Sequence, residues 1–227
     1  MFSTGQFVTC APLKINKGQL TMARRFVSNR NETVRMFDSN FLEWFSHIHP
    51  VTPIVLFMPL VTYLVWVSWS MNGLAMAEVA LLFIFGVFLW TFLEYILHRF
   101  IFHYVPKSKW GKRLHFVMHG VHHDYPSDAT RLVMAPGISL PLGAFFYLVY
   151  WFIFSSNVNA IFAGTMFGYV CYDTIHYATH HFKLNRGIGK WLRQYHMRHH
   201  FQDETTRYGV STPLWDYVFG TVGRRQK

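Results

Sequence analysis

Two long stretches of the 227-residue chain contain no lysine or arginine and are almost entirely apolar. The first runs from Val51 to Leu97 and the second from Leu132 to Phe182. A helix that crosses a hydrocarbon layer of about 30 Å needs roughly 20 apolar residues, so each stretch is long enough for two spans and a turn. The pattern therefore predicts four membrane-spanning helices in two hairpins, at about 52–69, 74–97, 134–154 and 160–177.

Apolar residues just before the first predicted span recur with the spacing of one helix face. They are Phe37, Phe41, Trp44, Phe45 and Ile48. We expect an amphipathic helix here, either lying in the membrane interface or packed on the cytosolic part of the protein. Both alternatives place this helix on the cytosolic side.

The placement of charge explains why so apolar a chain is strongly basic. Its 21 Lys and Arg exceed its 11 Asp and Glu, yet only 14% of residues are charged and 52% are hydrophobic, which excludes a disordered chain. Every basic residue lies outside the two predicted hairpins. Because Lys and Arg flank spans on the cytoplasmic side, we expect both termini and the middle segment to be cytosolic. The charge then sets orientation, and no nucleic-acid partner is expected.

Fourteen histidines occur, and twelve of them lie between His98 and His200. Ten form four spaced groups: HxxxxH at His98 and His103, HxxHH at His119, His122 and His123, HxxxH at His176 and His180, and HxxHH again at His196, His199 and His200. Residues three and four apart share one face of a helix, so each HxxHH group can chelate one ion with its outer rings and reach another with its middle ring. The groups therefore predict a dinuclear metal centre with five nitrogens per site. Imidazole suits iron, zinc, copper or nickel, which leaves the metal open.

Two acidic residues inside the apolar stretches are expected to support these histidines. Glu94 lies four residues before His98, and Asp173 lies three before His176. A histidine that binds metal usually donates its other ring N–H to a carboxylate, carbonyl or water. An unpaired carboxylate near the membrane boundary is unfavourable, so we expect both acids to accept such hydrogen bonds.

The remaining four histidines lie outside the spaced groups. His115 is one helical turn before the first HxxHH group, and His181 adjoins the HxxxH group, so we expect both beside the ligands. His47 and His49 precede the first predicted span without any such spacing. We expect them to take no part in metal binding.

Together these residues resemble the membrane fatty acid hydroxylase superfamily, and most closely the fatty acid 2-hydroxylases that act on sphingolipid acyl chains. The similarity suggests a hydroxylase domain at residues 34–222, between an N-terminal cytosolic segment at 1–33 and a basic tail at 223–227. The similar blocks are Glu94 to Phe100, His115 to His123, Arg131-Leu132-Val133, Tyr172 to Tyr177 and Gly209 to Asp216.

The resemblance implies an all-α integral membrane protein with four transmembrane helices and a cytosolic helical cap that holds two iron ions. One ion would be bound by His98, His103, His119, His123 and His199, and the other by His122, His176, His180, His196 and His200. The implied reaction is the O₂-dependent hydroxylation at C2 of a long-chain fatty acid or of a ceramide acyl chain, with no catalytic side chain beyond the ligands. Purified members of the family can carry zinc in place of iron.

The resemblance also implies partners and a location. About 50 residues precede the first predicted span, so we expect no fused cytochrome b5 domain and a separate electron donor, a cytochrome b5 or a ferredoxin-type protein. The membrane would be that of the endoplasmic reticulum in a eukaryote or the cytoplasmic membrane in a bacterium. Aromatic residues near the cytosolic ends of the spans are candidates for an acyl channel, although core or lipid packing is their more usual role: Trp90, Phe92, Tyr95 and Tyr177.

Two alternative functions remain open from the sequence. Sterol, sphingoid-base and carotenoid oxidases of the same superfamily share the histidine groups and differ in substrate. A membrane metal transporter is a function of another class, but it needs polar residues along a path through the membrane, and the predicted spans are nearly free of them.

Overall fold

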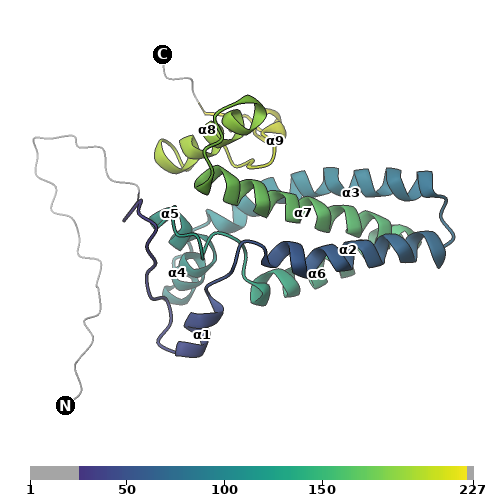
Figure 1. Ribbon diagram of the computed structural model, residues 1–227, viewed down its shortest axis with the longest axis horizontal. Helices are drawn as coiled ribbons and strands as arrows, with labels where there is room; N and C mark the ends of the chain where they lie inside the picture. The colour runs from purple at the N-terminus through teal and green to yellow at the C-terminus, as the bar shows by residue number, and fades with distance from the viewer. Residues whose placement is uncertain (1–25, 224–227) are drawn as a thin grey trace, which may run out of the picture.

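Four long helices run side by side along the long axis of the molecule in the computed structural model, which describes residues 26–223 (Figure 1). They are α2 (Thr52–Ser70), α3 (Met76–Ile96), α6 (Pro136–Phe154) and α7 (Val158–His181). These bounds lie within a few residues of the predicted ranges. The part of the chain that the structure describes contains helices and no strand, as the all-α prediction requires.

Within residues 26–223, three segments are long and apolar enough to cross a membrane: Thr52–Ser70, Met76–Phe102 and Pro136–His181. The third contains both α6 and α7, which are separated by a 3₁₀ turn, η3 (Ser155–Asn157). The chain reverses at this turn. Across it, the Tyr147 hydroxyl of α6 donates a hydrogen bond of 2.9 Å to Oδ1 of Asn159 in α7. The turn between α2 and α3 lies at the same end, where Asn72 Nδ2 donates to the Ser156 carbonyl at 2.9 Å.

Helix α7 lies at the centre of the bundle and packs against α2, α3 and α6. Two glycines allow an especially close approach of α3 and α7. A Cβ atom on Gly86 would lie 2.0 Å from the Ile161 carbonyl oxygen, and one on Gly164 would lie 2.0 Å from that of Phe83. Small residues permit such contacts between apolar helices. The close packing holds the C-terminal ends of α3 and α7, which carry histidines, beside each other.

Short helices gather at one end of the bundle (Figure 1). They are η1 (Leu97–Phe102), α4 (Lys109–His115), η2 (Phe116–Gly120), α5 (Val121–Asp124), α8 (Gly187–Phe201) and α9 (Leu214–Val218). Both η1 and η2 are π-helical turns, and each carries a histidine of the spaced groups. Such π-turns inside α-helices are frequent at functional sites.

The predicted amphipathic helix is shorter than its apolar pattern suggested. Helix α1 (Asn40–Phe45) begins after Ser39, whose hydroxyl accepts the N–H of Leu42, and Phe37 lies outside it. The reason is the Glu43 carboxylate, which accepts the backbone N–H groups of Met36 and Phe37 at 2.9 Å each and turns the preceding chain back on the helix. An apolar periodicity cannot reveal this competing hydrogen bonding.

The described part of the N-terminal segment packs against the end of the bundle where the short helices gather. Val27 N–H donates to the Asp124 carbonyl at 2.8 Å, and Ser127 Oγ donates to Asn29 Oδ1 at the same distance. Residues 26–33 therefore lie along the connection between α5 and α6. Residues 1–25 and 224–227, which include most of the two terminal segments drawn from the sequence, lie outside the described residues.

Candidate metal centre

The ten histidines of the spaced groups converge at the end of the bundle in two clusters of five. In each cluster one nitrogen of every histidine lies within 4.8 Å of the others. The first cluster contains His98, His103, His119, His123 and His199, and the second contains His122, His176, His180, His196 and His200. This grouping is the one that the family resemblance implied, while the binding of metal by these rings stays a prediction.

Helix α8 shows how one HxxHH group serves both clusters. His196 and His200 belong to the second cluster, with their Nε2 atoms 3.0 Å apart, while His199 belongs to the first. The group at residues 119–123 repeats the arrangement with the clusters exchanged. The outer rings of each group thus meet at one site and the middle ring reaches the other, as the helical spacing predicted.

The distances between ring nitrogens fit shared metal ions. Nε2 of His103 lies 2.9 Å from Nε2 of His199 and 3.2 Å from that of His98. In the second cluster, Nε2 of His180 lies 2.9 Å from that of His196. Imidazole nitrogens bind such metals at about 2.0–2.1 Å, so two ligands at right angles on one ion are about 3 Å apart. Each cluster therefore has the spacing of a metal site.

The rings outside the apolar segments are held in the neutral form. Burial lowers the pKa of His119, His122 and His200 well below the ordinary value of 6.5, and neighbouring histidines lower the pKa of each further. Neutral imidazole is the form that binds metal. These rings therefore need not lose a proton to act as ligands at neutral pH.

A loop at residues 206–211 orients two rings of the first cluster. His98 donates its Nδ1–H to the Tyr208 carbonyl, and His199 donates its Nδ1–H to the Thr206 carbonyl at 2.7 Å. A carbonyl can only accept, so these bonds fix the proton on Nδ1 and leave the Nε2 lone pair free for a metal.

Two buried carboxylates hold this loop in place. Glu94 Oε1 accepts the backbone N–H groups of Val210 and Ser211, the latter at 2.9 Å. Asp216 accepts those of Tyr208 and Gly209 at 2.9 and 2.8 Å. Glu94 thus supports the cluster through the loop, and no hydrogen bond joins it to a histidine within residues 26–223. No local pattern indicated this role for Asp216, although the residue ends a block that resembles the family.

The other predicted supporting residues lie close to the clusters without hydrogen bonds to them in the described structure. Asp173 is buried on α7 and lines the cavity described below. His181 stacks on the Tyr177 ring, with centroids 4.4 Å apart, and His115 ends α4. His47 belongs to neither cluster, and its Nδ1 is 2.8 Å from the Thr130 hydroxyl oxygen.

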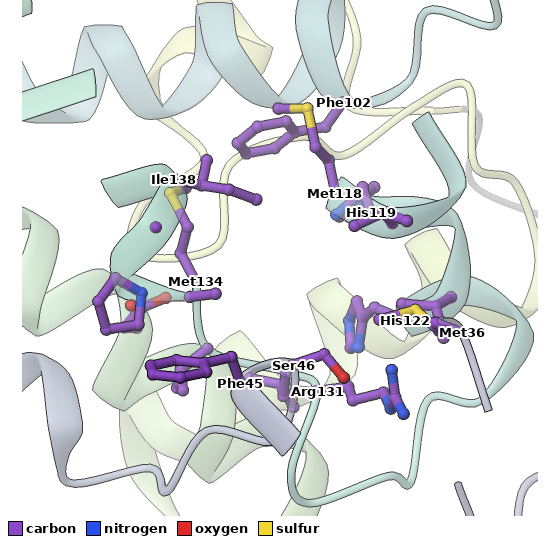
Figure 2. A pocket seen from close by; sticks show the side chains of 18 of the residues that line it. Met36, Phe45, Ser46, Phe102, Met118, His119, His122, Arg131, Met134 and Ile138 are labelled. Atoms are coloured by element: carbon purple, nitrogen blue, oxygen red, sulfur yellow. The ribbon is translucent and has the colours of Figure 1, made fainter. Parts of the chain in front are cut away.

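A cavity of about 400 Å³ reaches both clusters. His119 of the first cluster and His122 of the second form part of its wall, together with apolar side chains such as Phe102, Met134 and Ile138 (Figure 2). Figure 2 shows Phe102 and Met118 on one side of the cavity, Met134 and Ile138 on another, and the two histidines between Met118 and Arg131. The cavity therefore suits an apolar chain that ends beside the metal centre.

The four aromatic residues considered for an acyl channel do not line this cavity. Trp90 packs on Tyr169 and Tyr172 inside the bundle, Phe92 packs on Trp215, Tyr95 stacks on Phe219, and Tyr177 stacks on His181. These four side chains therefore pack against other rings, which is their more usual role. The cavity wall comes instead from residues 36–46, 102–122, 131–138 and 172–176, which folding brings together.

The fold and site agree with the comparisons to known proteins. A model of the fatty acid hydroxylase family matches residues 83–221. A dihydroceramide fatty acyl 2-hydroxylase of Arabidopsis thaliana is 39% identical over 192 residues, which cover 84% of this chain and 81% of that protein. The fatty acid 2-hydroxylase of Mus musculus is 36% identical over 210 residues, which cover 83% of this chain and 56% of that protein.

A solved structure of full-length scs7p, in which only the hydroxylase domain is visible, has the same fold. Its TM-score is 0.76 at 39% sequence identity, over 80% of this chain and 69% of that chain. Helices apolar enough to cross a membrane, with a histidine centre at one end, define a class of membrane hydroxylases. The chain belongs to the fatty acid hydroxylase family.

Proposed function

We propose that the protein hydroxylates C2 of a long-chain acyl group, with O₂ as co-substrate and two iron ions held by the two histidine clusters. The cavity carries this proposal, because it is mainly apolar and reaches histidines of both clusters at one end. The relatives named as dihydroceramide fatty acyl 2-hydroxylase and fatty acid 2-hydroxylase support the same reaction in this chain. The acyl group would belong to a free fatty acid or to a ceramide.

The proposed reaction, rather than the donor set, favours iron as the working metal. Cleaving a C–H bond of an alkyl chain is beyond protein side chains, and bound iron supplies the O₂ activation that this step requires. Zinc fits the same nitrogens but has no redox chemistry. The protein keeps the rings neutral, orients His98 and His199 through the 206–211 loop, and holds the chain in an apolar cavity away from water.

The same arrangement supports four membrane spans with the metal centre on the cytosolic side. Helices α6 and α7 have 19 and 24 residues, and about 20 residues suffice for one crossing. Neither interhelical turn contains Lys or Arg, whereas basic residues surround the opposite end of the bundle. Residues 34–222 would then form the hydroxylase domain, and its short helices would form a cytosolic cap.

The reaction needs electrons, and we infer that a separate protein such as a cytochrome b5 or a ferredoxin supplies them. Helix α4 is a candidate docking surface, because Lys109, Lys112 and Arg113 are exposed on it. An acidic donor would be attracted to this surface before forming a specific contact.

Lipid analysis tests the proposed function. The chain is expressed in a host that lacks 2-hydroxy acyl lipids, beside a His122→Ala variant and a His49→Ala control. We expect 2-hydroxy acyl lipids from the wild type and the control and none from His122→Ala. An unchanged acyl pool, or oxidation of a sterol or carotenoid instead, would reject the proposed reaction.

A further inference from the structure

The wall of the cavity is thin where α1 meets the first turn of α6. Three lining residues of the described structure are also exposed on the surface: Leu42, Phe45 and Gly137. Phe45 is 50% exposed and Leu42 is 49% exposed. The rest of the wall is buried or half-buried, as at Leu132 and Tyr172. A substrate that enters the cavity beside α1 therefore has the least protein to displace.

A second hollow of about 590 Å³, which we call the outer groove, borders the cavity at this wall. Its lining is mainly apolar and includes Trp44, Phe45, Ile48, Pro136, Gly137 and Leu140.

Phe45, Pro136 and Gly137 line both the outer groove and the cavity, so they separate the two spaces. Pro136 is a rigid ring and Gly137 has no side chain. Phe45 is therefore the one of the three whose side chain can turn and join the two spaces.

The outer groove lies beside the start of a helix that is expected to span the membrane. Helix α6 belongs to an apolar segment, and its residue Leu140 is exposed. Trp44 is exposed on the α1 side of the groove, and tryptophan is frequent at the level of the lipid headgroups. An apolar groove in this position faces the hydrocarbon layer in which a long acyl chain is dissolved. The chain can then reach the cavity without exposing its methylenes to water, which is unfavourable.

Phe45 can move without breaking the contacts that hold α1. None of the six residues of this helix is buried. Within residues 26–223, the ring of Phe45 packs on Phe41 and Trp44 of the same helix, with centroids 4.6 and 4.9 Å away. The helix is held instead at Glu43, which forms an ion pair with Arg131. Because exposed side chains change rotamer within nanoseconds, the ring can turn while this ion pair stays in place.

We propose that the acyl chain enters the cavity from the membrane between α1 and α6, through the outer groove, and that the Phe45 side chain is the gate of this entrance. Figure 2 shows Phe45 at the edge of the cavity opposite Phe102. This inference rests on the proposed function, which makes an acyl chain the occupant of the cavity. It assigns Phe45 to the rate of substrate entry and release.

Narrowing the entrance is the first test. Gly137→Phe adds a ring between the outer groove and the cavity, and a Cβ atom at this position would have no neighbouring atom within 4 Å, so the fold can accept it. Ala144→Phe is the control, because it adds the same ring at an exposed position of α6 that lines neither space. Equal Tm and equal metal content show that both variants are folded.

The measurement is the rate at which a fluorescent polyene acyl amide binds to the protein and leaves it in phosphatidylcholine vesicles. The protein is loaded with zinc, which has no redox chemistry, so no turnover interferes. Gly137→Phe should lower both rates by about tenfold or more, because an obstructed route slows movement in both directions, and Ala144→Phe should leave both unchanged. An unchanged association rate in Gly137→Phe would overturn this entrance.

Opening the gate is the second test. Phe45→Ala should raise the association rate severalfold in the same assay, since the ring no longer has to turn before the chain enters. A ring that only contacts the bound chain would raise the dissociation rate alone when it is removed. An unchanged association rate in Phe45→Ala would therefore overturn the role of Phe45.

A photoreactive chain tests what occupies the outer groove. A long-chain acyl amide that carries a diazirine at its middle is irradiated with the zinc-loaded protein in the same vesicles, and the adducts are located by mass spectrometry. We expect adducts at Trp44 and Leu140 that an excess of unlabelled amide suppresses. Absence of suppressible adducts there, whether bulk lipid or a second copy of the chain fills the groove, would overturn the proposal. Failure of the iron-loaded protein to hydroxylate any lipid would reject only the reaction, because none of these measurements needs turnover.

Discussion

Glu94 and His98 lie one helical turn apart and hold the same loop from two sides. Glu94 accepts the backbone N–H groups of Val210 and Ser211, and His98 donates its Nδ1–H to the Tyr208 carbonyl. Glu94 belongs to an apolar segment in which a carboxylate is costly. The Glu94 carboxylate has a structural role there, because it holds the loop that orients two rings of the first cluster.

Removing the Glu94 carboxylate should weaken metal binding at the first cluster. We expect Glu94→Ala to lower metal affinity by about 10- to 100-fold, the usual cost of losing an outer hydrogen-bond partner. Glu94→Gln keeps one acceptor oxygen and should retain most of the affinity. The measurement is metal per chain after dialysis against a chelator.

Glu78 provides a matched control for this experiment. It lies at the opposite end of α3, where its carboxylate accepts the Ala75 N–H at 2.8 Å. Glu78→Ala should retain metal as the wild type does. If Glu94→Ala retains as much metal as Glu78→Ala, the loop does not support the cluster.

The two clusters should lose metal separately. His199→Ala removes one of five nitrogens from the first cluster, and His180→Ala removes one from the second. Each change should release the ion of its own cluster and leave the other bound, as counted by elemental analysis of the purified protein, whereas His49→Ala should keep both. Full metal content in the cluster variants would show that the rings do not bind metal.

Glu43 should make stability depend on acid pH. Burial alone raises the pKa of Glu43, but the N–H groups of Phe37 and Met36 and the Arg131 guanidinium outweigh it and hold the pKa below its ordinary value of 4.5. A lowered carboxyl pKa stabilises the folded state fully above the unfolded value, and this stabilisation is lost as the pH falls through the folded value.

Thermal unfolding of the wild type and Glu43→Gln tests this dependence. The wild type should have the higher Tm above pH 4.5, and the difference should shrink as the pH falls further. His47 and Arg131 face the same carboxylate and are unchanged in the variant. A Tm difference that stays constant into strong acid would contradict the assignment.

Filling the cavity should block long acyl chains without loss of metal. Ile138 lines the cavity on α6, whereas Leu148 of the same helix is 56% exposed. Ile138→Trp should lower turnover of a long-chain substrate by about tenfold or more, and Leu148→Trp should not. The measurement is product formation at equal metal content, and equal turnover in the two variants would place the substrate elsewhere.

The sequence predicted the features that have a local period. Runs of apolar residues marked the four long helices, and the i, i+3, i+4 spacing of His196, His199 and His200 predicted that one group serves two sites. Both features depend on neighbours within one helix. Both features could therefore be predicted without knowing which distant segments of the chain pack together.

The supporting contacts could not be predicted because they join distant segments. Arg131 and Glu43 are 88 residues apart, and His98 and Tyr208 are 110 apart. No local pattern connects such pairs, so the cavity wall and the loop emerged only from the structure. The short length of α1 could not be predicted either, because hydrogen bonds to Glu43 outweigh the apolar periodicity.

The source and position of the hydroxyl oxygen test the proposed hydroxylation by two iron ions. Purified iron-loaded protein is given a reductant, ¹⁸O₂ and a long-chain acyl lipid, beside the His122→Ala variant. We expect a 2-hydroxy acyl product that carries one ¹⁸O atom from the wild type and no product from the variant. Product whose hydroxyl oxygen comes from water, or product formed equally well by His122→Ala, would contradict the proposed hydroxylation.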